Sequence, residues 1–310
     1  MFLVTVESTG LILYVSSVGL RKITMRFELF FLDAVDPSLG WLDYASLSQQ
    51  ALMEMVIDGI TNKEKICRDP DAPKDIEEWK GVVIEDGKVA EIDWDEFDIK
   101  GSLHLEWLPS SVREFGATSN RLTGTFDLAS LPTSMERLDL ASNASTGSIC
   151  LKRLPVRMEY LDVSDNKFCG SLKLESLSDT LTDFYASKNK FCGSVDLTRL
   201  PAALDNLDFR ENQLSGSVVL TQLPSNLEEI DLARNQFSGS LDLTQLPPNM
   251  FTLLLGNNSF SGTVDLSQLP QGLCFLDLSD NALSGEAFIS DEIFNSVHVE
   301  NTKIIKRHME

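Results

Sequence analysis

The stretch Ile230–Pro247, "IDLARNQFSGSLDLTQLP", decides the fold, because close copies of it lie before and after it in the chain. Aligning nine copies brings Asn, Gly and Pro into register with a spacing of 23 residues. The recurring glycines are Gly101, Gly124, Gly147, Gly170, Gly193, Gly216, Gly239, Gly262 and Gly285. The recurring prolines are Pro109, Pro132, Pro155, Pro201, Pro224, Pro247 and Pro270, and Ser178 stands in the missing place. A fixed period of this length is typical of a solenoid, in which each unit buries its apolar side only by stacking on its neighbours.

Alternating apolar residues predict two short strands in each unit. Ile230 and Leu232 alternate with polar residues, which indicates a strand with one buried face. Leu241 and Leu243 alternate in the same way and predict a second strand. Gly239 between them suits a bend that admits no side chain, so each unit should make one coil of the solenoid.

A ladder of asparagines is predicted to hold the coils together. The ladder consists of Asn120, Asn143, Asn166, Asn189, Asn212, Asn235, Asn258 and Asn281. Each stands where the chain leaves the first strand and turns inward. A buried amide there can donate to and accept from backbone groups of adjacent coils that would otherwise lack partners.

The complete unit, L-x-x-L-x-L-x-x-N-x-(L/F)-x-G-x-(L/V)-x-L-x-x-L-P, resembles the leucine-rich repeat. The S-G-S-L that follows the asparagine is similar to the L-x-G-x-I turn of the plant-type subclass, and the repeats also resemble those abundant in flagellate protists. The resemblance covers about residues 88–287. It implies an α/β solenoid, mostly β, that curves as a horseshoe or right-handed superhelix, with a parallel concave sheet and an N-terminal helical cap.

The domain boundaries follow from the extent of the repeats. We expect an N-terminal extension at 1–40, an N-terminal cap at 41–88, nine repeat units at 89–287 and a C-terminal cap and tail at 288–310. Atypical units are expected at both ends because a solenoid must cover its open apolar ends.

Within the N-terminal cap, residues 41–60 are predicted to form a helix that begins at a capping box of Ser46 and Gln49. Residues 62–75 are predicted to be a loop. In the following segment, Trp79 belongs to a W-x-G-V sequence that is similar to the N-terminal cap of plant-type extracellular repeat proteins. That cap has two cysteines, whose places are taken here by Glu77 and Ile84.

At the C-terminal end, Val297–Asn301 is predicted to be a shortened last strand that closes the stack. The basic tail from Lys303 to His308 is predicted to be solvated rather than folded.

The composition restricts the partner and the location. The chain has a formal net charge of −21, which argues against nucleic acid or an anionic membrane as the main partner. Stable membrane insertion is not expected, because no stretch approaches about 20 apolar residues. Residues 1–20 lack the basic start of a secretory signal. Together with only five cysteines, this predicts a cytoplasmic protein, with a secreted or cell-surface protein as the alternative.

No catalytic constellation stands out, so an enzyme, a cofactor and a metal site are not predicted. The three histidines have no neighbours that suggest a relay or a metal site. Cys169 and Cys192 are one period apart, which would place their Cα atoms about 5 Å apart in stacked coils. A disulfide there and two free thiols both remain open.

The residues between the strand leucines are predicted to point out from the concave sheet. Two exposed aromatic or apolar pairs, each beside carboxylates, are predicted to form an interface with a protein partner. The candidate residues are Tyr160, Asp162, Asp183, Tyr185, Asp208, Glu229, Asp231, Leu254, Phe275 and Asp277. The alternative is that the acidic row only keeps the solenoid soluble.

These observations predict a non-enzymatic module that binds a protein with a basic surface on its concave, acidic face. A secreted or cell-surface recognition or adhesion protein is the second hypothesis. The oligomeric state and the identity of the partner do not follow from the sequence.

Overall fold

A computed structural model describes residues 6–7, 10–11, 44–70 and 72–309 and separates the chain into two compact units, Met1–Ser46 and Leu47–Glu310. The first unit contains the antiparallel strands β1 (Val6–Glu7) and β2 (Gly10–Leu11) and the 3-10 helix η1 (Tyr44–Ser46). Most of the predicted extension at 1–40, with the segment considered for targeting, lies outside the described residues.

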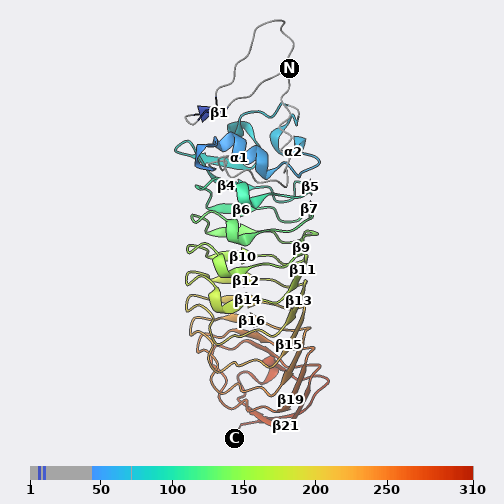
Figure 1. The fold of residues 1–310 in the computed structure, drawn as a ribbon. Helices are drawn as coiled ribbons and strands as arrows, with labels where there is room; N and C mark the ends of the chain where they lie inside the picture. The colour runs from blue at the N-terminus through green and yellow to red at the C-terminus, as the bar shows by residue number, and fades with distance from the viewer. Residues whose placement is uncertain (1–5, 8–9, 12–43, 71, 310) are drawn as a thin grey trace, which may run out of the picture. The chain divides into compact units, whose positions relative to one another are not determined.

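The second unit is a stack of coils in which each repeat adds one strand to an eleven-stranded sheet (Figure 1). Its strands are β3 (Val82–Glu85), β4 (Lys88–Asp93), β6 (Glu114–Gly116), β8 (Arg137–Asp139), β10 (Tyr160–Asp162), β12 (Asp183–Tyr185), β14 (Asn206–Asp208), β16 (Glu229–Asp231), β18 (Thr252–Leu254), β20 (Phe275–Asp277) and β22 (Val297–His298). From β4 to β22 all neighbours are parallel. The parallel sheet and the repeat predicted from the sequence are therefore confirmed.

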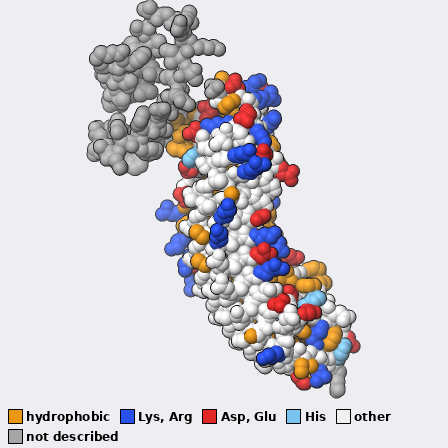
Figure 2. Space-filling view, turned by 90° about the vertical axis from the view of Figure 1, so that its right-hand side faces the viewer, with side chains coloured by type: hydrophobic (Ala, Val, Ile, Leu, Met, Phe, Trp, Pro, Cys, Tyr) orange, Lys and Arg blue, Asp and Glu red, His pale blue; other side chains and the backbone are white. Residues whose placement is uncertain are grey.

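A second sheet of eight parallel strands lies on another side of the coils (Figure 1). It consists of β9 (Thr146–Gly147), β11 (Lys167–Gly170), β13 (Lys190–Gly193), β15 (Gln213–Gly216), β17 (Gln236–Gly239), β19 (Ser259–Thr263), β21 (Ala282–Ile289) and β23 (Lys303–His308). In the first coils, β5 (Lys100–Gly101) pairs separately with β7 (Arg121–Leu122). Figure 2 views the face of this sheet, which is largely neither charged nor hydrophobic along its middle.

The second strand of the coil was predicted in the wrong place. In the sixth unit it is β17, which precedes the glycine bend, and not the segment around Leu241 and Leu243. Gly239 closes the strand with a φ of 88° and turns the chain away from the sheet. Leu241 and Leu243 are buried beyond that bend without joining a strand.

The corner after the bend is a short 3-10 helix in the earlier coils. These helices are η3 (Leu105–Trp107), η4 (Leu128–Ser130), η5 (Leu151–Arg153) and η6 (Leu174–Ser176). In each of them the first leucine is buried. Later coils make a hydrogen-bonded turn at the same place.

The ladder asparagines connect successive coils through their side-chain amides. The Oδ1 of Asn212 accepts the backbone N–H of Phe191 at 3.0 Å, and its Nδ2 donates to the carbonyl of Ala186 at 2.9 Å. The same Nδ2 lies 3.1 Å from the carbonyl of Phe209 in its own coil. The pattern repeats at the other ladder positions, as predicted.

A left-handed residue precedes each ladder asparagine, which the sequence did not predict. The residues are Ser119, Ser142, Asp165, Lys188, Glu211, Arg234, Asn257 and Asp280, with φ between 51° and 56°. This conformation is rare for residues other than glycine. It reverses the chain between the two sheets and brings the asparagine inward.

Stacked aromatic rings fill the core beneath the second sheet. Phe168 and Phe191 stack with centroids 6.3 Å apart, and Phe237 and Phe260 at 6.2 Å. All four side chains are fully buried. The position two residues after the ladder asparagines therefore supplies apolar contact along much of the stack, with Ser145 as the exception.

The N-terminal helix is shorter than predicted and begins at a different residue. Helix α1 (Gln49–Val56) starts at Ser48, whose side chain accepts the N–H of Ala51, and not at Ser46. Met53 and Val56 on α1 join the same core as the coils, and the N–H of His104 donates to the carbonyl of Val56. That α1 acts as the cap of the stack stays a prediction.

The predicted loop at 62–75 contains one helical turn, α2 (Glu64–Cys67), and ends before η2 (Ile76–Glu78). Trp79 is buried and its indole N–H donates to the carbonyl of Lys74 at 2.8 Å. The chain then forms the antiparallel hairpin of β3 and β4, which starts the eleven-stranded sheet.

At the other end, β22 closes the eleven-stranded sheet as the predicted last strand, preceded by η7 (Phe294–Ser296). The basic tail was predicted wrongly, because Lys303–His308 forms strand β23 and pairs in parallel with β21. Its short alternating pattern gave too little apolar signal for a strand.

Candidate functional site

Two rows of side chains lie on the outer face of the eleven-stranded sheet, which we call the sheet face. The first row has one residue from each strand of this sheet between β4 and β20: Glu91, Glu114, Arg137, Tyr160, Asp183, Asn206, Glu229, Thr252 and Phe275. The second is Asp93, Gly116, Asp139, Asp162, Tyr185, Asp208, Asp231, Leu254, Asp277 and His298. The residue between the two rows on each strand is buried, so both rows point away from the core.

The aspartates of the second row also have a structural role that the sequence did not predict. The Oδ1 of Asp231 accepts the backbone N–H of Ala233 at 2.9 Å, which fixes the turn after the strand. The other aspartates of the row, Asp93, Asp139, Asp162, Asp208 and Asp277, accept the N–H two residues on in the same way. Asp side chains commonly form such turns. Each therefore offers a partner mainly its second carboxylate oxygen.

Burial raises the pKa of several of these carboxyl groups. The Asp231 side chain is only 13% exposed, and its burial raises the pKa of the carboxyl to about 6. The backbone N–H of Ala233 opposes this shift, while the charge of Asp208 adds to it. Burial also raises the pKa values of Asp162 and Asp208. Asp231 is thus less ionised near neutral pH than an exposed aspartate would be.

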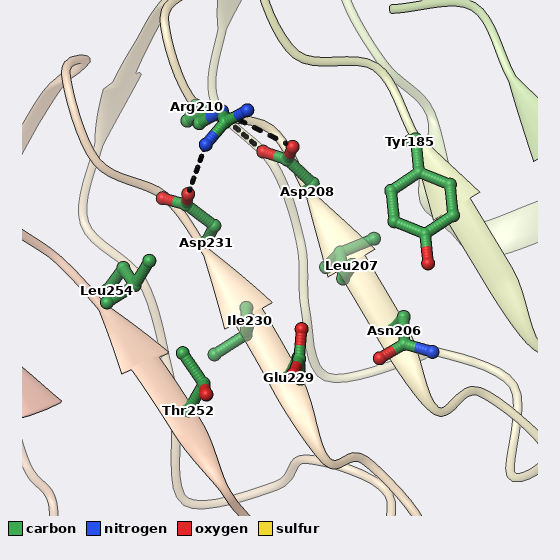
Figure 3. A pocket seen from close by; sticks show the side chains of 10 residues that line it. All are labelled: Tyr185, Asn206, Leu207, Asp208, Arg210, Glu229, Ile230, Asp231, Thr252 and Leu254. Carbon is green, nitrogen blue, oxygen red and sulfur yellow. Dashed lines mark hydrogen bonds and ion pairs between the residues drawn. The ribbon is translucent and has the colours of Figure 1, made fainter. Parts of the chain in front are cut away.

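A single arginine bridges two neighbouring aspartates of the second row. The Nε of Arg210 lies 3.5 Å from Asp208, and its Nη1 lies 3.9 Å from Asp231. These groups border a hollow of about 180 Å³ in the sheet face (Figure 3). Tyr185 stands at one side of the hollow and Leu254 at the other, so the hollow has carboxylates in the middle and apolar side chains at its ends.

The two tyrosines predicted to be neighbours are in contact. The rings of Tyr160 and Tyr185 have centroids 5.6 Å apart and are tilted by 50°. The hydroxyl of Tyr185 donates to Asp183 at 3.0 Å, and Asp183 also accepts from the amide of Asn206 at 2.7 Å. Burial, with the adjacent carboxylates, raises the pKa values of both phenols, so both remain donors at physiological pH.

A cation already lies on one of these rings. The guanidinium carbon of Arg137 is 3.5 Å from the ring centroid of Tyr160, a cation–π arrangement. Arg137 belongs to the neighbouring strand β8, directly opposite Tyr160. The tyrosine pair therefore has one ring covered by a cation of the chain and one ring, that of Tyr185, beside the hollow.

The second predicted pair, Leu254 and Phe275, is diagonal on β18 and β20. The aromatic partner of Phe275 is instead His298, whose ring stacks on it with centroids 4.6 Å apart. His298 lies opposite Asp277. The sequence did not predict this contact because the repeat is interrupted there: the pairing offset falls from 23 residues to 21 at β22.

The structure brings together Tyr185, Asp208, Glu229, Asp231 and Leu254 around the hollow, with Tyr160, Asp162 and Asp183 in the strands beside it. Phe275 and Asp277 lie on β20, next to β18. Arg210 was missed because it follows the strand and lies outside the alternating positions. The backbone N–H of Arg210 donates to Asp208, and the resulting turn places the Arg210 guanidinium beside the second row.

The described residues contain no group of three or more His, Cys, Asp or Glu side chains suited to a metal ion. The five cysteines are free thiols. Cys169 lies opposite Lys190, and Cys192 opposite Gln213, so the two cysteines are two residues out of register. The close approach expected for this pair was therefore wrong. In the described part of the chain no helix is long and apolar enough to cross a membrane.

No protein-family model and no curated protein matches the chain. Solved structures do. The leucine-rich-repeat ectodomain of the plant membrane receptor kinase GASSHO1/SCHENGEN3 from Arabidopsis thaliana, in complex with CASPARIAN STRIP INTEGRITY FACTOR 2, is 24% identical with a TM-score of 0.68. The match covers 83% of this chain and 36% of that one.

Two further structures have the same architecture. PEPR1–AtPEP1 is 21% identical with a TM-score of 0.65, over 84% of this chain and 41% of that one. A plant ice-binding protein is 20% identical with a TM-score of 0.53, over 77% of this chain and 87% of that one. The chain thus spans less than half the length of the GASSHO1/SCHENGEN3 and PEPR1–AtPEP1 structures.

These comparisons bear on the fold and give no support to the predicted cytoplasmic location. The similarity to protist repeats stays a prediction. The period of 23 residues, the asparagine ladder, the parallel sheets and the solved neighbours agree on one architecture. The chain therefore has the leucine-rich-repeat fold.

Proposed function

We propose that the chain is a non-enzymatic interaction module that binds a polypeptide with basic and apolar side chains on the sheet face. The observation that carries the proposal is the contact of Tyr160 with Tyr185 beside the carboxylate of Asp183. Aromatic rings at the centre of a patch that carboxylates surround are typical of residues that dominate binding energy.

The shape of the sheet favours binding without rearrangement. Strand neighbours are fixed by backbone hydrogen bonds and by the asparagine ladder, so little conformational entropy is lost when a partner binds. An apolar side chain of the partner would enter the hollow against Tyr185 and Leu254, while its cations would meet the second oxygens of Asp208 and Asp231. The negative charge of the two rows would also increase the rate of association.

The test is capture of partners from the native cell, with identification by proximity labelling, followed by affinity measurement with the purified partner. The double variant Tyr160→Ala, Tyr185→Ala should weaken binding by at least tenfold, and rising salt should weaken it further. The control is Val219→Ala, an exposed apolar residue outside the sheet face. Unchanged affinity in the double variant would remove the tyrosines from the site.

A secreted or cell-surface recognition protein, the second hypothesis from the sequence, would use the same face in another location. It is favoured by the ectodomain of a membrane receptor kinase among the solved neighbours. Cell fractionation with N-terminal sequencing would decide it. A processed chain outside the cell supports this hypothesis, and an unprocessed chain in the cytosol contradicts it.

Ice is a second candidate ligand, for a different surface. One neighbour is an ice-binding protein, and on the eight-stranded sheet the hydroxyl side chains of Ser238 and Ser259 lie opposite each other on neighbouring strands, about 4.8 Å apart. Ser215 on β15 and Ser261 on β19 are further serines of this sheet. Inhibition of ice recrystallisation that Ser238→Lys with Ser261→Lys abolishes, and Tyr160→Ala does not, would support this candidate. Absence of any inhibition would exclude it.

A further inference from the structure

Strand β23 forms the C-terminal edge of the eight-stranded sheet, and in the described part of the chain its outer side has no partner strand. It pairs with β21 over six residues, from Ser284 opposite Lys303 to Ile289 opposite His308. The edge strands at the other sheet ends are four residues or shorter. β23 is therefore the longest open edge of the second unit.

The alternation of the backbone shows which groups of β23 are open. The N–H of Met309 donates to the carbonyl of Ile289 at 3.0 Å, so it points towards β21. Because successive residues of a strand point to opposite sides, the N–H groups of Ile304, Lys306 and His308 point away from β21. That of Ile304 is bound by the Thr302 hydroxyl at 3.2 Å. The other two have no hydrogen-bond partner within the described residues.

An apolar patch lies on the exposed face of this edge. Ile305 is 51% exposed, Phe288 50% and Met309 43%. Ile305 lies opposite Glu286, and Phe288 opposite Arg307, whose guanidinium pairs with Glu286 at 3.1 Å. Figure 2 shows hydrophobic, basic, acidic and His side chains mixed at the lower end of the molecule, where Figure 1 places β21. Every second residue of an added strand would contact this patch.

The charge of the edge indicates what kind of strand would fit. β23 carries Lys303, Lys306, Arg307 and His308 and no acidic residue, in a chain of net charge −21. The ammonium of Lys303 has no ion pair in the part of the chain described here. A second copy added antiparallel would place these cations beside one another, which is unfavourable. A strand with carboxylates would be complementary.

We propose that β23 binds an extended, acidic segment of another polypeptide, which adds to the eight-stranded sheet as a further strand. Its backbone would bond the open groups of Lys306 and His308. Its apolar side chains would cover Ile305 and Met309, and its carboxylates would lie near Lys303 and Arg307. This site is separate from the sheet face.

The probe is an eight-residue peptide of alternating valine and glutamate, acetylated and amidated at its ends, with a lysine-for-glutamate peptide as control. At low ionic strength the acidic peptide should bind, and hydrogen exchange of the Lys306 and His308 amides should slow at least tenfold. The variant Lys303→Glu, Arg307→Glu should weaken binding at least tenfold. Its matched control, Lys167→Glu with Lys190→Glu, makes the same charge change on the inner strands β11 and β13 and should bind normally.

Circular dichroism checks that each variant is folded. Should the charge reversal at β23 unfold the edge, His308→Pro removes one outward N–H at a position where an edge strand tolerates proline, and it should weaken binding by itself. Equal binding of the lysine peptide, or unchanged exchange at Lys306 and His308, would overturn the proposal. So would self-association of the chain through β23 in sedimentation. The Tyr160→Ala, Tyr185→Ala variant should bind the peptide normally. The proposal for the sheet face and the proposal for β23 can therefore be contradicted separately.

Discussion

The side-chain oxygen of Asn212 accepts the backbone N–H of Phe191 at 3.0 Å, across 21 residues of chain. The same amide donates to carbonyls of its own coil and of the coil before it. One buried side chain thus satisfies backbone groups of two coils, which would lose their partners without it.

Replacing this residue should be strongly destabilising. In Asn212→Ala the buried N–H of Phe191 loses its partner, and the carbonyl of Ala186 loses the shorter of its two amide donors, keeping the one from Asn189 at 3.3 Å. A lost buried partner costs about 1–3 kcal/mol. We expect the free energy of unfolding to fall by roughly 3 kcal/mol, measured by urea denaturation. The exposed Asn226→Ala is the control and should change it by no more than about 0.5 kcal/mol. Equal effects of the two variants would contradict the role of the ladder.

The glycine bend gives a second prediction. Gly239 has a φ of 88°, and an added Cβ would lie 3.3 Å from the Cβ of Ser217 in the preceding coil. Gly239→Ala should therefore lower the free energy of unfolding by about 1–2 kcal/mol. Gly272→Ala, with no atom closer than 4.0 Å and no left-handed backbone, should be close to neutral. Thermal unfolding is measured for both variants. Gly239→Ala reports the backbone strain together with the added methyl group, and Gly272→Ala reports the added methyl group alone.

The buried carboxyl of Asp231 gives a pH-dependent prediction. Its pKa of about 6 in the folded chain exceeds the ordinary 3.8, so the folded state binds the proton more tightly than the unfolded state. The contribution of this group to stability is present below about pH 4 and is lost as the pH rises through 6. Asp231→Asn keeps an oxygen for the Ala233 N–H and should stabilise the chain by about 1–2 kcal/mol at pH 7.

The measurement is urea denaturation of Asp231→Asn and the unchanged chain between pH 4 and 8. The difference between the two should shrink as the pH falls through 6 towards 4 and should vanish only below the ordinary pKa of 3.8, where Asp231 is protonated in both states. A difference that does not vary with pH would show that its pKa is not raised.

Arg210 should set where that transition lies. Its charge lowers the pKa of Asp231, so Arg210→Gln should move the transition to higher pH. The control Arg234→Gln removes the same charge beside Glu211 and should leave the transition in place. A shift of equal size in both variants would indicate an effect of net charge rather than of the bridge.

The sequence predicted the eleven-stranded sheet well because its register equals the period of the repeat. Asp183 is 23 residues from Asn206, and the two lie opposite each other on β12 and β14. The alternation of leucines therefore sufficed to place Tyr160 beside Tyr185. The alternation did not reveal that each aspartate accepts a backbone N–H of its own chain, since it shows only which side of the strand a side chain is on. The bond forms because the short Asp side chain reaches the N–H two residues on, at the end of the strand.

The second sheet was less predictable because its register differs from the period. Cys169 faces Lys190, so equivalent residues of successive units are not neighbours there. Strand β23 was not predicted either. Its pairing with β21 depends on contacts between residues far apart in the sequence, which the pattern of its own six residues does not encode.

The uniform offsets of the two sheets have an evolutionary consequence. Each interior coil bonds the coil before it and the coil after it in the same way, so nothing in the middle of the stack records its total length. Recombination between misaligned units would add or delete 23 residues at a time and leave every junction unchanged. Such a gene can lengthen or shorten its product by whole turns, while the atypical units at the two ends of the stack are kept.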